Sequence, residues 1–319
     1  MNKLLIICGP TATGKTSLGI YLAKRFKGEI VSADSRQVYQ RMDIGTGKDI
    51  PKGAIYKKVN KKIGGYYETN GIKIWGYDLV DPKDEFNVAQ YIRFAREVIK
   101  DIHKRNKLPI LVGGTGFYIK SVVEGIGTAE IPQNIALRKN LKKIPKDELF
   151  EKLAILDSSK AGSLNKSDKG NPRRLFRAIE IATWRLSNLG LQNKEEKFDY
   201  DTFFIGLNMP KQALHKKIKV RVDKRVEGVK KEISYLLKQG IDWSSQSMSS
   251  LGYRQWKEYF EGKETEGMAI NKWFLEEKKY SKRQITWFKK NKKISWYSIN
   301  SFKWKENVEK FIEKWYSSS

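Results

Sequence analysis

The first third of the chain alternates between short apolar runs and stretches with helical periodicity. The apolar runs at residues 3–8, 29–34 and 109–112 have the length of buried strands. Residues 15–26 and 87–104 instead space their apolar side chains as an amphipathic helix does. Buried strands that alternate with helices are typical of a parallel sheet covered by helices on both faces. The sequence therefore predicts an α/β fold.

Residues 46–70 depart from this alternation, because they are rich in Lys and Gly and have weak periodicity. We predict that they form a surface excursion ahead of the apolar stretch at residues 72–80. Further along, residues 203–207 have the pattern of another buried strand, and residues 211–238 have the pattern of one long helix with charged faces.

Residues 121–193 differ again, since they show helical patterns, for example at 171–186, and no pattern typical of a buried strand. This change predicts a helical insertion within the α/β core. The expected domains are a core of residues 1–120 and 200–319, and a mainly helical insertion of residues 121–199.

Charge points to a polyanionic partner. The chain has 63 Lys and Arg against 36 Asp and Glu, which gives a formal net charge of +27. In the last fifth, aromatic residues are interleaved with Lys and Arg, and residues 282–293 hold six basic residues out of twelve. We expect most of these aromatic side chains to pack in the core and some to stack on unpaired RNA bases.

Several classes of protein are excluded by composition. One cysteine rules out an internal disulfide framework, and two histidines leave no zinc or haem site. The apolar run at residues 4–8 is too short to span a membrane and lacks the pattern of a signal peptide. We therefore expect a cytoplasmic protein with no membrane segment.

The clearest motif is a P-loop, G-x-x-x-x-G-K-[ST], between the first predicted strand and the first predicted helix. Its backbone N–H groups would bind a diphosphate or a triphosphate at the positive end of the helix, Lys15 adds a charge, and the Thr16 hydroxyl is a ligand for Mg²⁺. The diphosphate-binding residues are Gly9, Pro10, Thr11, Ala12, Thr13, Gly14, Lys15 and Thr16.

A P-loop does not identify the reaction, so residues at other strand ends matter. Asp34 ends the second predicted strand and is a candidate general base, with a helix N-cap or an outer-sphere Mg²⁺ ligand as the alternative. A glycine-rich turn at residues 113–116 follows the third strand. An ATP-dependent kinase would also need a carboxylate at a strand end, and Asp78 and Asp81 are available for that role.

Six ordered blocks carry a resemblance over nearly the whole chain; they lie at residues 9–16, 32–46, 112–118, 171–180, 251–254 and 282–288. With these blocks the chain resembles the tRNA dimethylallyltransferases of the bacterial type. The resemblance implies a P-loop NTPase-like core and transfer of the dimethylallyl group from dimethylallyl diphosphate to N6 of the adenosine 3′ of the anticodon, position 37, with release of pyrophosphate. It also implies Mg²⁺ as cofactor and the tRNA anticodon stem-loop as partner, and we expect a monomer.

The resemblance also implies roles for individual residues. Asp34 matches the catalytic aspartate, Thr115 matches a residue that contacts the target base, and Arg221 matches an arginine that acts with Lys15 around the diphosphate. The residues expected to bind tRNA are Asp34, Ser35, Arg36, Gln37, Thr115, Arg138, Arg173, Arg174, Arg177, Arg254, Lys282, Arg283, Gln284 and Trp287. Family members commonly have a histidine where this chain has Tyr77, which leaves the role of that position open.

Three alternatives remain at this stage. A P-loop kinase acting on a small metabolite or nucleoside shares the fold and Mg²⁺, and an adenylate isopentenyltransferase shares the donor. Both leave the helical insertion and the basic, aromatic C-terminal region unexplained. An RNA-binding protein without chemistry leaves the P-loop and Asp34 without a purpose.

Overall fold

The structure is a computed structural model that describes residues 2–60, 63–188 and 199–318. The chain divides into two compact units. The larger unit comprises Met1–Glu124 and Phe198–Ser319, and the smaller comprises Gly125–Lys197. The smaller unit falls within the segment for which the sequence predicts a helical insertion.

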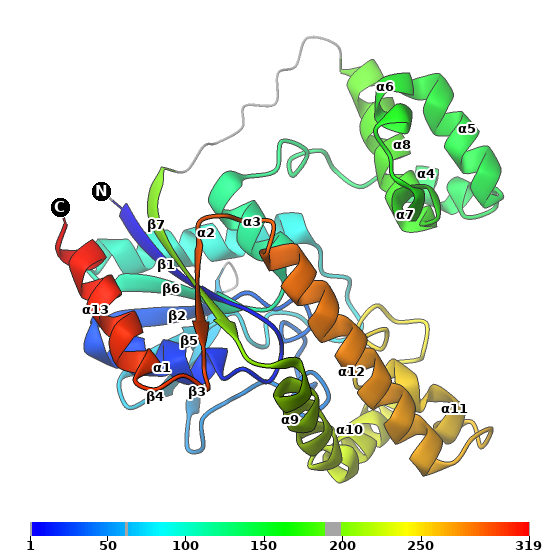
Figure 1. The fold of residues 1–319 in the computed structure, drawn as a ribbon. Helices are drawn as coiled ribbons and strands as arrows, with labels where there is room; N and C mark the ends of the chain where they lie inside the picture. The colour runs from blue at the N-terminus through cyan, green and yellow to red at the C-terminus, as the bar shows by residue number, and fades with distance from the viewer. Residues whose placement is uncertain (1, 61–62, 189–198, 319) are drawn as a thin grey trace. The chain divides into compact units, whose positions relative to one another are not determined.

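The larger unit is built on an eight-stranded sheet with the order β3-β4-β5-β2-β6-β1-β7-β8 (Figure 1). Strands β5, β2, β6, β1, β7 and β8 are parallel, whereas β3 and β4 extend the sheet in antiparallel fashion. The strands are β1 Asn2–Cys8, β2 Gly28–Ser32, β3 Ile55–Asn60, β4 Gly64–Thr69, β5 Ile72–Trp75, β6 Leu108–Gly113, β7 Tyr200–Asn208 and β8 Ile294–Ser298. The predicted α/β fold with a parallel core is confirmed.

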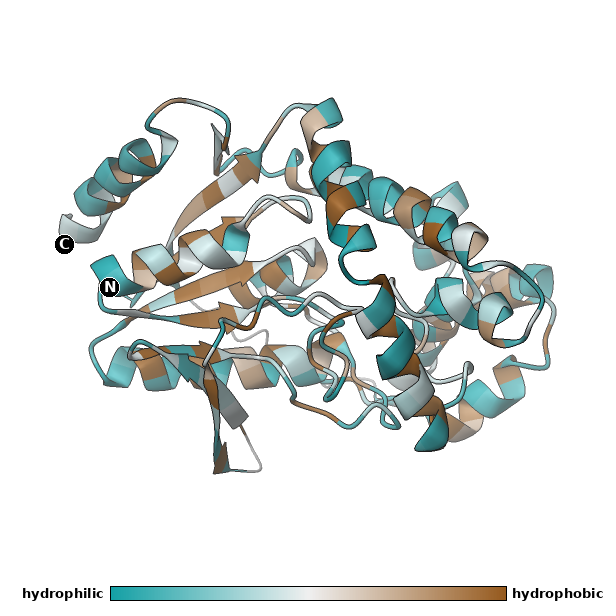
Figure 2. Ribbon diagram, turned by 90° about the horizontal axis from the view of Figure 1, so that it is seen from below, coloured by the Kyte–Doolittle hydropathy of each residue, from teal (hydrophilic) through white to brown (hydrophobic). Residues whose placement is uncertain are grey.

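Helices cover both faces of this sheet. The helices of the larger unit are α1 Lys15–Arg25, α2 Val88–Lys104, α3 Gly116–Glu124, α9 Lys211–Asp223, α10 Val226–Lys238, α11 Lys257–Phe260, α12 Glu266–Phe288 and α13 Trp304–Ser317, with a 3₁₀ turn at Arg254–Trp256. Helices α2 and α3 pack on one face and α1 and α13 on the other. In Figure 2 the central strands are mostly hydrophobic, while the helices mix hydrophobic and hydrophilic residues, as amphipathic covering layers do.

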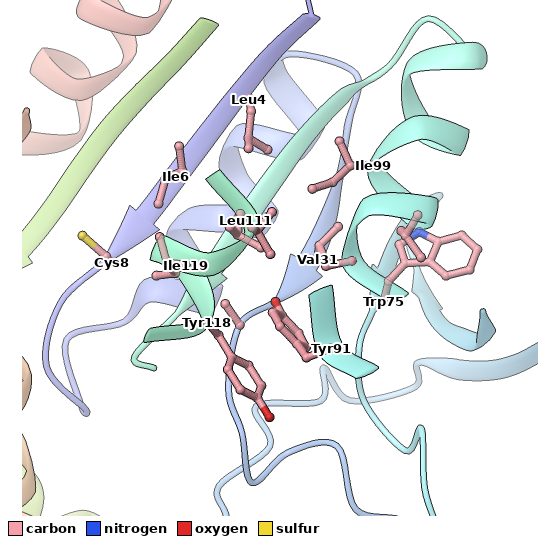
Figure 3. Packing of buried hydrophobic residues seen from close by; sticks show 14 of the residues in the cluster. Leu4, Ile6, Cys8, Val31, Trp75, Tyr91, Ile99, Leu111, Tyr118 and Ile119 are labelled. Atoms are coloured by element: carbon pink, nitrogen blue, oxygen red, sulfur yellow. The ribbon is translucent and has the colours of Figure 1, made fainter. Parts of the chain in front are cut away.

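Figure 3 shows part of the packing on the first face, where Leu4 of β1, Leu111 of β6 and Ile99 of α2 belong to one buried hydrophobic cluster. Helix α2 begins where the sequence predicts. The Asn87 side chain accepts a hydrogen bond from the Gln90 N–H, and the Gln90 side chain accepts one from the Asn87 N–H. This reciprocal cap satisfies two backbone donors that the first turn would otherwise leave free.

Two expectations were wrong. Residues 46–70 are not only a surface excursion, because they contain the whole of β3 and β4, which pair in antiparallel fashion. Strand β3 is an exposed edge strand, so its backbone pairs without the hydrophobic alternation that marks buried strands. Residues 211–238 are not one helix either, since α9 ends at Asp223 and α10 begins at Val226.

The smaller unit has its own hydrophobic core, which includes Leu141, Leu153, Leu175 and Ile179. Its regular elements, within the part of this unit that the structure describes, are all helices: α4 Ile135–Leu141, α5 Lys146–Leu156, α6 Ser158–Gly162, α7 Lys166–Lys169 and α8 Pro172–Ser187. Asn171 caps α8 by accepting a hydrogen bond from the Arg173 N–H, and Pro172 occupies the first helical position.

Candidate active site

The P-loop lies between β1 and α1, in the strand–loop–helix context that the motif predicts. Gly9 has a φ of 136°, and a Cβ there would lie 2.4 Å from the Leu207 carbonyl oxygen, so no larger residue fits. Thr13 Oγ1 and Lys15 Nζ both donate to the Pro10 carbonyl oxygen, at 2.9 and 2.8 Å. The loop is thereby folded back on itself, with the lysine arched over it.

The Lys15 ammonium group is buried close to a second cation, Arg221. Burial lowers the pKa of its ammonium group to about 8, and the charge of Arg221 lowers it in the same direction. Asp34 acts in the opposite sense but does not compensate. A site that destabilises its own cation in this way gains stability when a polyanion binds, because the anion restores the favourable environment of the charged lysine.

A cavity of about 270 Å³ opens at the carboxyl ends of β1, β2 and β6, where parallel sheets bind ligands. The predicted site residues that line it are Thr11, Ala12, Gly14, Lys15, Thr16, Asp34, Ser35, Arg36, Gln37, Arg221, Arg254, Arg283 and Gln284. Most of the predicted site in the larger unit is therefore brought together. Gly9, Pro10 and Thr13 belong to the same loop without lining the cavity, and Lys282 is exposed on α12.

Asp34 follows the end of β2 and lines the cavity. Its Oδ1 accepts a hydrogen bond from the Arg36 N–H at 2.9 Å, an Asx-type turn that fixes the carboxylate. Burial raises the pKa of the Asp34 carboxyl, whereas the backbone N–H of Arg36 and the charge of Lys15 lower it. The net direction is upward, which makes Asp34 a stronger base than a solvated aspartate.

Thr115 joins the ends of two neighbouring parallel strands. Its N–H donates to the Ala33 carbonyl oxygen at 3.1 Å, and its Oγ1 accepts from the Ser35 N–H at 3.1 Å. Thr115 thus holds the segment that carries Asp34 beside the glycine-rich turn after β6.

Two arginines reach the cavity from the junction of α9 and α10. Arg221 donates to Thr11 Oγ1 and to the Gly47 carbonyl oxygen, the latter at 3.2 Å. Arg225 was not predicted from the sequence; it also lines the cavity, and burial together with the charge of Arg221 lowers its pKa to about 10. The break between the two helices is what the long-helix prediction missed, and Arg225 stands at that break as the residue before α10.

Gln284 of helix α12 forms part of another wall of the cavity. Gln284 Oε1 accepts from the Thr11 N–H, and Nε2 donates to the Gly114 carbonyl oxygen, both at 2.9 Å. The residue is 4% exposed, so its amide already has two partners inside the protein. Glu277, one further residue that sequence reasoning missed, lines the same cavity, and burial raises the pKa of its carboxyl.

Four of the arginines that are predicted to bind tRNA lie in the smaller unit. Arg138 and Arg177 both pair with the buried carboxylate of Glu180, at 2.6 and 3.3 Å, and Arg177 also donates to the Thr128 carbonyl oxygen. Arg174 pairs with Asp168, and Arg173 is exposed. Arg138 and Arg177 therefore neutralise a buried carboxylate within the smaller unit. Contact of the four arginines with RNA stays a prediction.

Neither carboxylate proposed for a kinase lines the cavity. Asp78 accepts hydrogen bonds from Lys48 and Tyr67, and Asp81 pairs with Arg41. Tyr77, the residue at the position left open, is buried and lines the cavity. The cavity thus brings the P-loop together with the carboxylate of Asp34, whereas the two carboxylates that the sequence offered for a kinase, Asp78 and Asp81, are not part of its lining.

No helix in the described ranges is long and apolar enough to cross a membrane.

Comparisons with known proteins agree with this geometry. The family model described as IPP transferase matches residues 37–291, and the model described as isopentenyl transferase matches residues 2–59. A tRNA dimethylallyltransferase of Caldanaerobacter subterraneus is 37% identical over 97% of this chain and 96% of its own length. The one from Anoxybacillus flavithermus is 36% identical over 93% and 91%.

A solved structure points the same way. The tRNA isopentenylpyrophosphate transferase of Bacillus halodurans is 32% identical, covers 99% of this chain and 97% of its own, and superimposes with a TM-score of 0.68. The family match spans most of the chain, including the segment of Asp34, the glycine-rich turn and α12. The chain therefore belongs to the IPP transferase family, whose relatives found here are tRNA dimethylallyltransferases.

Proposed function

We propose that this protein transfers the dimethylallyl group from dimethylallyl diphosphate to N6 of the adenosine 3′ of the anticodon, position 37, in tRNA. The observation that carries the proposal is the shared cavity, in which the P-loop and Arg221 face the carboxylate of Asp34. A diphosphate leaving group and a base for the incoming amine are the two requirements of this reaction. The names of the relatives support tRNA as the acceptor.

The P-loop side would hold the donor. Its N–H groups, Lys15, Arg221 and Arg225 present positive charge to the diphosphate. As the bond between the allylic carbon and the bridging oxygen breaks, negative charge grows on that oxygen, and fixed positive groups stabilise it where it develops. The binding energy is thereby directed to the transition state.

Magnesium fits this side of the cavity. The side chain of Thr16 stands in the first turn of α1 and lines the cavity, and hydroxyl and phosphate oxygens are the hard donors that Mg²⁺ prefers. We propose that Thr16 and the diphosphate hold the ion, which when bound supplies further charge neutralisation.

The Asp34 carboxylate would accept the proton that the adenine N6 amine loses. The N6 amine of adenine is a weak nucleophile because its lone pair is delocalised into the ring. As N6 bonds to the allylic carbon and pyrophosphate leaves, the excess proton on N6 passes to the Asp34 carboxylate. Thr115 and the Arg36 N–H fix the position of the segment that carries this carboxylate.

The target base must leave its stack to reach the cavity, which costs least in a loop. Arg254 and Arg283 line the cavity, and the net charge of +27 favours an RNA partner. These features support the anticodon stem-loop as the element recognised. We also propose that the protein acts as a monomer.

The test is a comparison of substrates. The purified protein is incubated with Mg²⁺ and unmodified tRNA plus dimethylallyl diphosphate, free AMP plus the same donor, or ATP with nucleosides, and the products are identified by mass. The proposal expects prenylated adenosine in tRNA only. Prenylation of AMP alone, or transfer of phosphate from ATP, would overturn it.

A further inference from the structure

Two large aromatic side chains stand exposed beside each other on the larger unit. Phe117 of α3 is 45% exposed and Trp287 of α12 is 43% exposed. Their ring centroids are 6.4 Å apart with an interplanar angle of 83°, an edge-to-face contact. By contrast Trp256 and Trp273, which pack in the helical core, are 0% exposed. Part of the aromatic surface of both side chains is therefore exposed to solvent.

The pair adjoins the cavity. Trp287 lies directly on Gly116, where an added Cβ would be 2.0 Å from the indole Cδ1. Gly116 follows Thr115, which is bonded to the segment of Asp34. One turn earlier on α12, Arg283 and Gln284 line the cavity itself. The aromatic surface thus continues the cavity wall outward between α3 and α12.

Cations surround this aromatic surface. On α12 and just beyond it, the exposed basic residues near Trp287 are Lys282, Arg283, Lys289 and Lys290. On α3, Lys120 follows Phe117 by one turn and is also exposed. A ring face bordered by positive charge matches a nucleobase with its flanking phosphates better than it matches an apolar partner.

We propose that Phe117 and Trp287 form a stacking platform for an unpaired base of the tRNA anticodon loop adjacent to the adenosine that enters the cavity. This inference rests on the proposed function. When one base leaves the loop stack, its neighbour loses a stacking partner, and the platform replaces that partner outside the cavity. Because every base has a π-face, the platform stabilises the bound loop without selecting a particular base.

The decisive variants are Phe117→Leu and Phe117→Tyr, since leucine keeps apolar packing on α12 but lacks a ring, whereas tyrosine keeps the ring. Phe117→Leu should raise the KM for an anticodon stem-loop roughly tenfold, with kcat and the KM for the donor little changed. Phe117→Tyr should restore the wild-type KM. Phe302→Ala is the matched control, because Phe302 is 84% exposed in the loop before α13.

A second readout reports stacking itself. Stem-loops that carry 2-aminopurine at each position flanking the target adenosine should lose fluorescence on binding wild type at one position, and this quenching should disappear with Trp287→Ala. Equal KM values for the leucine and tyrosine variants, or quenching that survives Trp287→Ala, would overturn the platform. Wild type that does not prenylate any tRNA would instead overturn the proposed function.

Discussion

The two walls of the cavity are held in place by contacts of different sequence separation. The P-loop, residues 9–16, takes its shape mainly from local features, namely its glycines and two hydrogen bonds to its own Pro10 carbonyl oxygen, and Gln284 and Arg221 add contacts from distant helices only at Thr11. The facing segment after β2, residues 33–49 and called here the β2 loop, is fixed by side chains from distant parts of the chain. Contacts within a short segment can be recognised from the sequence, whereas contacts between distant segments become visible only in the folded protein.

Two anchors hold the β2 loop. The Glu232 carboxylate of α10 accepts the N–H groups of Asp43, Ile44 and Gly45 at 2.8 to 3.0 Å. The Lys48 side chain is fully buried and pairs with Asp43 and Asp78. These contacts place the Gly47 carbonyl oxygen against Arg221, and so connect the β2 loop to the donor side.

The largest expected effect is on catalysis at Asp34. Asp34→Ala should lower kcat for transfer to tRNA by roughly 10²–10⁴-fold, because it removes the carboxylate that is proposed to take the proton. Affinity for tRNA, measured by filter binding, should stay within about threefold of wild type. Loss of binding together with transfer would show that the carboxylate serves the fold of the β2 loop instead.

Removing the buried charge of Lys48 should break the β2 loop. Lys48→Met keeps the length of the side chain but leaves the Asp78 carboxylate without its cation, and we expect the free energy of unfolding to fall by about 3 kcal/mol. Denaturant melts measure this, with the exposed Lys52→Met as the control. A change as small as that of the control would contradict the role given to Lys48.

The two walls should also titrate separately. With its pKa lowered to about 8, Lys15 is charged below pH 8 and loses its proton as the pH rises through that value. The kcat/KM for the donor should therefore decline above about pH 8, and Lys15→Arg should remove this alkaline decline. Asp34 should give an acid limb at a higher pH than an ordinary aspartate. An alkaline limb that persists in Lys15→Arg would assign it to another group.

The smallest effect is expected from removing one of the two local hydrogen bonds that shape the P-loop. Thr13→Val removes the 2.9 Å hydrogen bond to the Pro10 carbonyl oxygen while keeping the shape of the side chain. We expect a loss of about 1 kcal/mol in stability and an increase in the KM for the donor of a few-fold. If Thr13→Val destabilised the protein more than Lys48→Met, the contrast between the two walls would be wrong.

The same contrast explains what the sequence could predict. The P-loop and the parallel core were predicted correctly, because glycines and short apolar runs encode them locally. Arg221 came from the resemblance alone, since a basic residue in a helical pattern is usually solvated. Arg225 and Glu277 carried no signal, because their roles depend on a helix break and on packing of α12. The edge strand β3 was missed because it buries no face.

The measurement that tests the account most directly is the stoichiometry and location of transfer. Unmodified tRNA, dimethylallyl diphosphate, Mg²⁺ and the protein are allowed to react, pyrophosphate is quantified, and the tRNA is digested and sequenced by mass. The account predicts one pyrophosphate released for each dimethylallyl group, with that group on the adenosine 3′ of the anticodon. Pyrophosphate release without modified tRNA, or a dimethylallyl group at another site, would contradict it.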